Sequence, residues 1–120
     1  MFIKDFLIAH RIDLSVGTSL ELAVDELFTN IIRHQPIVKD PVVISLKKED
    51  NQIVLCLKTS GVDDFDPRQV PEPDFNSPLR ELKPGGLGVY LVRRVIDDLQ
   101  YEYCPEKRES IITLVKKLET

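Results

Sequence analysis

The sequence is poor in cysteine and lacks any long apolar run, and both absences narrow what the protein can be. Its two cysteines, Cys56 and Cys104, have no spacing typical of a zinc site, so we expect buried or half-buried thiols rather than a metal site or a disulfide. No stretch approaches the roughly 18 apolar residues that cross a bilayer. The start, MFIKDFLIAHRIDL, has Lys4 and Asp5 inside its apolar pattern and does not resemble a signal peptide. We therefore expect a cytoplasmic protein without membrane association.

Clustered positive charge is also lacking. The 120 residues carry a formal net charge of −4, and Lys and Arg are scattered along the chain. Because neutralising phosphates needs a clustered basic surface, direct nucleic-acid binding is disfavoured. The length suits one domain with one modest core, spanning 1–120.

The apolar pattern predicts two helices in the first third of the chain, at 2–10 and 16–34. Thr18 followed by Glu21 resembles a capping box at the start of the second helix, and Pro36 ends it. Four residues at helical spacing form its buried stripe: Leu20, Val24, Leu27 and Ile31.

The remaining elements are predicted to be strands around one more helix. VVISLKK and IVLCLKT, separated by EDNQ, indicate a hairpin, and QYEYC with SIITLVKKL indicates a closing antiparallel pair. Residues 60–84 hold five of the eight prolines and are expected to form a long loop. A helix is expected over 87–99, with a stripe of Leu87, Leu91, Val95 and Leu99. This order predicts a two-layer α/β (α+β) sandwich with a mainly antiparallel sheet and helices on one face.

Three polar residues follow each other at four-residue steps on the long helix: Glu26, Asn30 and His34. Each step turns about 40°, so they form a slanting stripe beside the buried one. An amide oxygen suits magnesium, and a carboxylate one turn away can act as a base. The alternative is an exposed polar helix face with no chemistry.

Glycine is scarce, yet three of five glycines stand just before the last predicted helix, at Gly85, Gly86 and Gly88. Unpaired N–H groups at a helix start attract phosphates, and glycine removes the Cβ that would keep a phosphate away. The alternative is a turn that merely uses glycine.

The segment TSGVDDFDP, residues 59–67, joins the first hairpin to the proline-rich loop. Gly61 there would let a flat ring approach the backbone. The acids that follow are expected to be cap or turn residues, as in most such clusters; they are Asp63, Asp64 and Asp66.

The order of these motifs resembles the GHKL (Bergerat) ATP-binding fold. Glu-x3-Asn-x3-His on a helix, Gly-x3-Phe-Asp-Pro after a strand and GGLG opening a second helix follow each other as in that superfamily. Within it, DELFTNIIRH, FDP…PEPDFNSPLRELKPGGLGVYLVRRVIDDLQYEY and TLVKKL resemble the small stand-alone anti-sigma-factor serine/threonine kinases. The likeness runs from about Leu20 to Leu118.

The resemblance implies a site for ATP and Mg²⁺. Glu26 would be the general base that takes the proton from a partner's serine hydroxyl, and Asn30 the magnesium ligand. The ATP phosphates would be wrapped by Gly85, Gly86 and Gly88, and Leu87 between them would also belong to the nucleotide site. Residues from about 67 to 84 would form a lid.

The base pocket is implied by the same resemblance. Gly61 would lie against the adenine, Thr113 would lie near the base, and His34 would support the site. Thr59 stands where the family has an aspartate that accepts a hydrogen bond from the adenine amino group, which implies weaker or altered nucleotide binding.

The implied function is an ATP- and Mg²⁺-dependent serine/threonine protein kinase. It would phosphorylate an anti-sigma-factor antagonist of small α/β fold and sequester a sigma factor or response regulator. The alternative is a partner-switching module that has lost catalysis, with weak or no ATP binding. The family's first strand has no counterpart here, and the sheet edge this would expose invites a partner chain or a homodimer.

Overall fold

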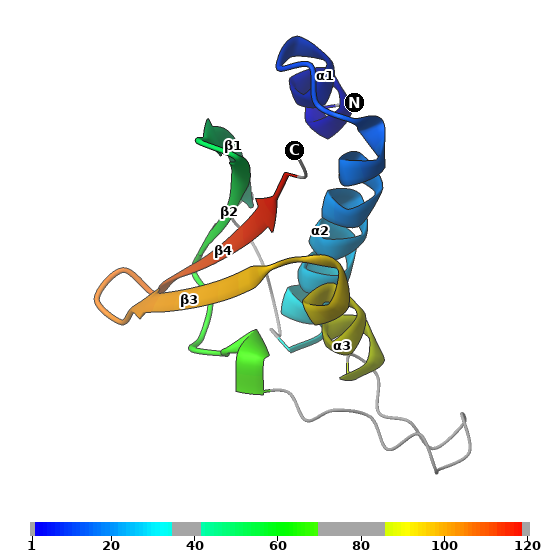
Figure 1. Ribbon diagram of the computed structural model, residues 1–120. Helices are drawn as coiled ribbons and strands as arrows, with labels where there is room; N and C mark the ends of the chain where they lie inside the picture. Colours follow the sequence, from blue (N-terminus) through cyan, green and yellow to red (C-terminus); the bar gives the residue numbers. More distant parts are fainter. Residues whose placement is uncertain (1, 35–41, 70–85, 119–120) are drawn as a thin grey trace, which may run out of the picture.

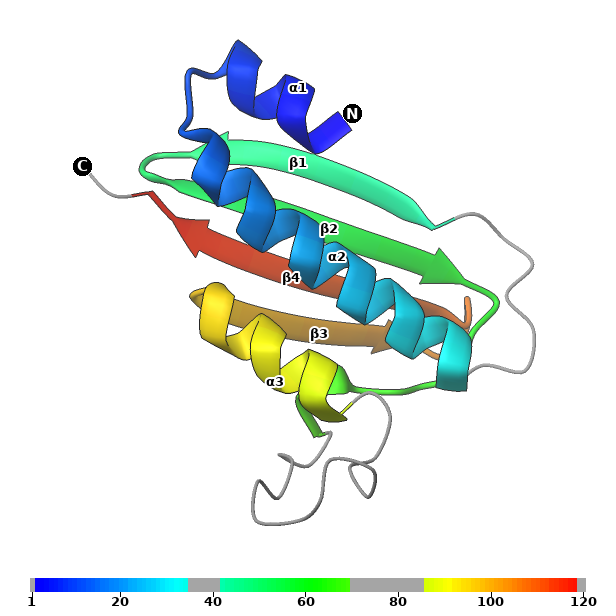
Figure 2. The same ribbon diagram turned by 90° about the vertical axis from the view of Figure 1, so that its right-hand side faces the viewer.

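A computed structural model describes residues 2–34, 42–69 and 86–118. In this part of the chain a four-stranded sheet carries the helices on one face, so the molecule has two layers (Figures 1 and 2). The elements run α1 Phe2–Ala9, α2 Leu14–His34, β1 Val43–Glu49, β2 Gln52–Ser60, η1 Pro67–Gln69, α3 Gly86–Val95, β3 Asp98–Cys104 and β4 Glu109–Lys117. The predicted α+β sandwich is confirmed.

The sheet has the order β1-β2-β4-β3, and every neighbouring pair is antiparallel. The turns of the two hairpins each hold a residue with positive φ, Asp50 at 51° and Arg108 at 48°. Both predicted hairpins are therefore confirmed. The central β2–β4 pairing connects the two hairpins and places Thr59 opposite Ser110.

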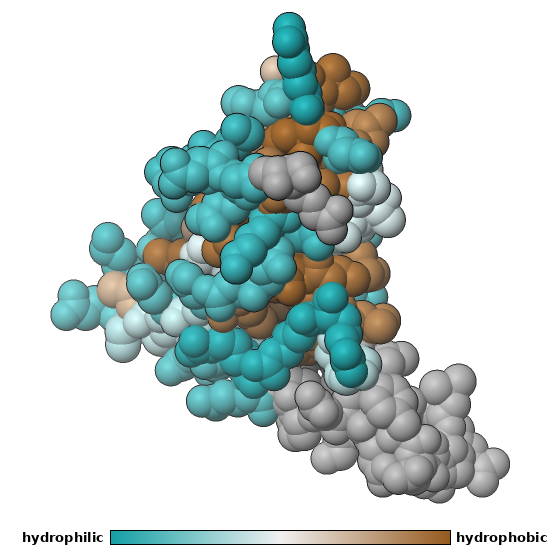
Figure 3. Space-filling view, in the orientation of Figure 1, coloured by the Kyte–Doolittle hydropathy of each residue, from teal (hydrophilic) through white to brown (hydrophobic). Residues whose placement is uncertain are grey.

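The core lies between the sheet and α2. In β2 every second side chain is buried, from Ile53 through Leu55 and Leu57 to Thr59, because alternate residues of a strand face the same side. Leu20, Leu27 and Ile31 of the predicted α2 stripe are buried against them. Hydrophobic surface that remains exposed gathers mainly along α1 and α2, while the sheet side is largely hydrophilic (Figure 3). No described helix combines the length and apolar character needed to cross a membrane.

The predicted start of α2 was wrong. The helix begins at Leu14, and its cap is Asp13, whose Oδ1 accepts a hydrogen bond from the backbone N–H of Ser15 at 2.9 Å. Thr18 lies inside the helix and is exposed, so it caps nothing. Both residue types favour N-caps, and Val16 packing against the core favours the earlier start.

The predicted stripe of the last helix was wrong in part. α3 ends at Val95, which packs against the core as predicted, but Leu91 is 38% exposed. The buried residues are Val89 and Val92, followed by Ile96 just past the helix end. Leu99 is buried as predicted, but as a residue of β3. The helix stops because the backbone joins the sheet: the N–H of Asp97 donates to the carbonyl of Val115 at 2.9 Å.

Candidate functional site

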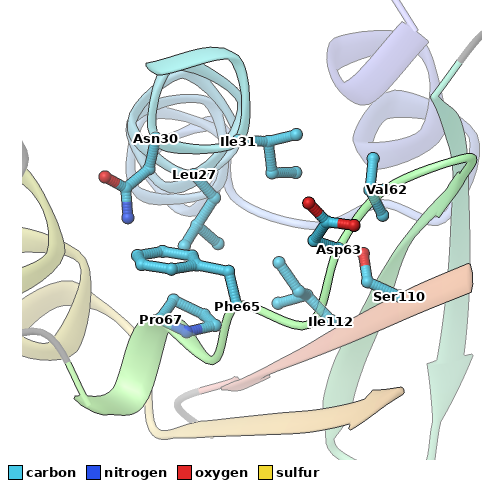
Figure 4. A pocket seen from close by; sticks show the side chains of 9 residues that line it. All are labelled: Leu27, Asn30, Ile31, Val62, Asp63, Phe65, Pro67, Ser110 and Ile112. Carbon is cyan, nitrogen blue, oxygen red and sulfur yellow. The ribbon is translucent and has the colours of Figure 1, made fainter. Parts of the chain in front are cut away.

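A small pocket lies beneath the C-terminal half of α2. Its walls come from α2, from the segment 62–67 that follows β2, and from β4 (Figure 4). The ring of Phe65 lies below the Asn30 amide, with Pro67 beyond it. The space left among these residues is about 10 Å³, which accommodates one water molecule and not an adenine ring.

Asn30 is the most unusual residue of the pocket. Its side chain is 1% exposed, and neither Oδ1 nor Nδ2 finds a hydrogen-bond partner within the described ranges. Burying a polar group without a partner costs about 1–3 kcal/mol, and such groups in native proteins call for an explanation. The alternative of an exposed polar helix face is thus wrong for Asn30, whose amide is placed to bind a water, a cation or a polar ligand.

Glu26 lies one turn before Asn30 and meets α3. A Cβ added to Gly88 would overlap the Glu26 carboxylate and lie 3.0 Å from its Cδ. The missing side chain therefore leaves room for a carboxylate at this point. In the described structure, the group that approaches Gly88 is Glu26, so the first turn of α3 lies against α2 one turn before Asn30.

The other predicted phosphate-binding residues are placed only in part. Gly86 is the first residue of α3, where N–H groups are free of intrahelical partners. Leu87 follows it in the helix, and His34 is the last residue of α2, but their side chains lie outside the described part. Gly85 and the predicted lid beyond Gln69 also lie outside the described residues.

Thr59 and Gly61 mark the end of β2. The Thr59 side chain is fully buried on the helix side of the sheet, and its Oγ1 has no hydrogen-bond partner in the described part of the chain. Gly61 has a φ of 72°, a left-handed conformation that favours glycine. Here glycine serves a turn, after which the N–H of Val62 donates to the carbonyl of Arg108 at 3.0 Å.

The structure does not bring Thr113 to the pocket. Its neighbours Ile112 and Leu114 are buried toward the helices, so Thr113 faces the opposite side of the sheet, where it pairs with Cys56. Ser110 lines the pocket in the place that was expected for Thr113. The alternation of apolar residues in SIITLVKKL was the sequence signal that could have shown this.

Two tyrosines of β3, which the sequence interpretation missed, form hydrogen bonds with the segment 62–67 that lines the pocket. Tyr101 donates through its hydroxyl to Asp64 Oδ1 at 2.8 Å and accepts from the N–H of Phe65 at 3.0 Å. Tyr103 donates to the carbonyl of Val62 at 2.7 Å. Burial, together with the hydrogen bond to Asp64, raises the pKa of Tyr101. These contacts position Phe65 under α2.

The neighbouring acids act as turn residues, as predicted. Asp66 accepts hydrogen bonds from the backbone N–H of Arg68 at 2.9 Å and from its guanidinium at 2.8 Å. This bonding lowers the pKa of Asp66. Asp63 pairs with Arg108 at 2.8 Å across the loop. These contacts fix the segment, and Asp63 also lines the pocket.

The arrangement of the strands and helices can first be compared with solved structures. The chain is similar to the Acinetobacter baumannii histidine kinase AdeS, with a TM-score of 0.55 and 16% identity over 86% of this chain and 47% of that one. At this identity the likeness shows a shared fold alone. The family follows from the sequence: residues 1–116 match the histidine kinase-like ATPase domain, and the chain belongs to that family.

Curated relatives point to one branch. The chain is 31% identical over 87 residues to a serine-protein kinase RsbW of Bacillus cereus, covering 68% of this chain and 53% of the relative. An RsbW of Bacillus thuringiensis is 30% identical over 87 residues, with the same coverage. The chain thus spans about half the length of the curated relatives it matches.

Proposed function

We propose that this chain is an anti-sigma regulatory factor that acts as an ATP- and Mg²⁺-dependent serine/threonine protein kinase. Its substrate would be a serine or threonine of an anti-sigma-factor antagonist, and its client a sigma factor or similar regulator. Support comes from the family membership and from relatives named as serine-protein kinases. The single observation that carries the proposal is the buried amide of Asn30, which has no hydrogen-bond partner among the described residues and lies one turn from a carboxylate that meets Gly88.

The residues present fit a magnesium nucleotide. Mg²⁺ is usually held by one or two protein ligands together with phosphate oxygens, so the Oδ1 of Asn30 suffices as the protein ligand. Bound there, the ion would neutralise charge on the transferred phosphoryl group. The start of α3 at Gly86 offers unpaired N–H groups for phosphate oxygens.

In this proposal Glu26 is the general base. Glu26 accepts the proton of the attacking hydroxyl, and the missing side chain of Gly88 leaves room for the Glu26 carboxylate. Thr59, Gly61 and Ser110 lie at the end of the strands where the base would be read. Because Phe65 fills the pocket under Asn30, we expect its side chain to turn away when nucleotide binds.

A second candidate function is a partner-switching module without catalysis. Two observations favour it: Phe65 and Pro67 fill the space beneath Asn30, and the position expected to read adenine carries the neutral Thr59. Such a protein would bind its partners with the fold alone.

Phosphate transfer separates the two functions. With radiolabelled ATP and a candidate anti-sigma-factor antagonist, we expect phosphate transfer that falls by about 10²–10⁴-fold in Glu26→Gln. Calorimetry with ATP and Mg²⁺ should show nucleotide binding to the wild type and to Glu26→Gln alike, since glutamine keeps the shape of the glutamate side chain. Absence of heat at millimolar nucleotide, with no transfer, would instead establish the binding module.

Gly88→Ala provides a matched variant. Alanine favours a helix over glycine by about 1 kcal/mol, and only the flexible end of Glu26 must move to admit the new Cβ. We expect unchanged or slightly raised thermal stability together with a large loss of phosphate transfer. Full activity in this variant would show that the Glu26–Gly88 contact has no part in catalysis.

A further inference from the structure

A second hollow lies at the other end of the sheet. Its walls come from the α1–α2 connection, the first turns of α2, the β1–β2 turn and the end of β4, which meet at one end of the molecule in Figures 1 and 2. The volume is about 800 Å³. Thr59 and Ser110 stand at the opposite ends of β2 and β4, so about 25 Å of strand separates this hollow from the Asn30 pocket.

The hollow gathers positive charge. Lysines and arginines that are scattered along the sequence line it together, and we call it the basic cleft, defined by Arg11, Lys48, Lys116 and Lys117. Among the described residues one acidic side chain, Asp13, also lines it, although the whole chain has a net charge of −4. Within residues 2–34, 42–69 and 86–118, none of the four cations forms an ion pair with a carboxylate.

The strand register sets the spacing of two of these cations. Lys48 of β1 and Lys116 of β4 are both paired with Ile53 of the intervening β2, so all three lie in one row on the helix side of the sheet. Two strand spacings separate the lysines, about 10 Å. In the described part of the chain their ammonium groups donate to backbone carbonyls, of Asp50 at 3.3 Å and Val95 at 2.7 Å.

Arg11 enters the cleft from the helix layer. It follows the end of α1 with a φ of 56°, and the N–H of Ile12 donates to the carbonyl of Leu7 at 2.9 Å, the bond of a Schellman-type helix end. Glycine adopts this conformation without steric cost. The backbone conformation therefore does not favour arginine over glycine at this position. The positive charge that Arg11 adds to a cleft also lined by Lys48 does favour it.

The cleft also has an apolar part. Ile12, Val16 and Leu118 line it, and all three are half-buried and pack against the core. A cationic rim around apolar side chains is the pattern of a protein interface, in which an apolar anchor is surrounded by polar contacts. A single phosphate would use neither the apolar part nor two cations about 10 Å apart.

We propose that the basic cleft binds an acidic segment of a protein partner: a peptide in which Asp or Glu residues flank an apolar side chain. The apolar side chain packs on Ile12, Val16 and Leu118, and the carboxylates pair with the cations around them. The site is separate from the Asn30 pocket and needs no nucleotide, so it stands or falls independently of the kinase proposal.

Fluorescence anisotropy tests this with labelled peptides and the full chain. The probe is Glu-Asp-Leu-Asp-Glu, and its control is Gln-Asn-Leu-Asn-Gln. We expect the acidic peptide alone to bind, and to bind more weakly as salt rises from about 0.1 M to about 1 M, because the Debye length falls from about 10 to about 3 Å. Lys48→Glu should weaken binding by about five- to tenfold.

Two further variants guard the interpretation. Lys107→Glu makes the same charge change in the β3–β4 turn, far from the cleft, and should leave the affinity within about twofold. Arg11→Gly removes the charge and the left-handed arginine together, so its melting temperature should stay equal or rise while affinity falls. Equal binding of both peptides, no binding at millimolar peptide, or equal loss in Lys107→Glu would overturn the proposal.

Discussion

The two ends of the sheet differ in how they treat polar groups. At the pocket end, Asn30 and Thr59 are buried with no hydrogen-bond partner among the described residues. At the cleft end, lysines and an arginine line an open hollow. Burying a polar group without a hydrogen bond costs free energy of folding, whereas a solvated polar group carries no such cost. We therefore expect substitutions at the pocket end to change folding stability, and substitutions at the cleft end to change binding affinity.

The largest effect is expected from Thr59→Asp without ligand. A carboxylate at this fully buried position loses its hydration, so the free energy of unfolding at pH 7 should fall by about 3 kcal/mol or more. Burial raises the pKa of such a carboxyl, so the loss should shrink as pH is lowered toward about 4. Urea unfolding across pH measures this.

Thr113→Asp is the matched control for that substitution. It places the same group on the opposite face of the sheet, and we expect a loss below about 1 kcal/mol. A similar loss of unfolding free energy in both variants would show that the two positions are equally accessible to water. If the kinase proposal holds, Thr59→Asp should also tighten ATP binding.

Asn30→Leu should stabilise the protein without ligand. Leucine has a similar volume and no polar atoms, so the free energy of unfolding should rise by about 1–3 kcal/mol while nucleotide binding is lost. Thr29→Leu, exposed on the same helix turn, should change stability by less than about 0.5 kcal/mol. Destabilisation by Asn30→Leu would mean that the amide already has a partner in the folded protein.

Tyr101→Phe should cost about 1 kcal/mol, because it removes the hydrogen bonds with Asp64 and the Phe65 N–H. The raised pKa of Tyr101 also gives a pH signature. Its stabilising contribution is fully present below about pH 10, the ordinary tyrosine pKa, and is lost as pH rises beyond it. Thermal melts from about pH 8 to about pH 11 should therefore show a steeper decline for the wild type than for Tyr101→Phe.

The smallest effect on folding is expected at the cleft end. Lys48→Glu should change the free energy of unfolding by less than about 0.5 kcal/mol, since within the described residues its ammonium group donates to one exposed backbone carbonyl, that of Asp50. Chemical denaturation of this variant beside Thr59→Asp compares the two ends directly. A loss above about 2 kcal/mol would mean that the cleft lysine is part of the folded core.

Local patterns predicted the layers and both hairpins because those features depend on neighbours in the sequence. The α2 stripe and the alternation in β2 each have one strong period, and the fold agrees with them. The start of α2 was missed because Asp13 and Thr18 are both good caps, and only packing of Val16 decides between them. α3 was misjudged because its end is set by Asp97 bonding to Val115 across the fold.

The site was predictable as a set of residue types and less so as a geometry. The contact between Glu26 and Gly88 fits the order of motifs, and Asn30 lies one turn from Glu26 on α2. The position of Thr113 depended on strand register, and the support from Tyr101 and Tyr103 depended on contacts across about 40 residues of sequence. No local period carries such information.

The absence of a side chain at Gly88 has a consequence for how this protein can change over generations. Any residue larger than glycine there must push aside the acid on the facing helix. Positions 26 and 88 are therefore expected to covary: natural variants that enlarge one should shorten or relocate the other, and lineages that abandon the chemistry should be the first to lose both.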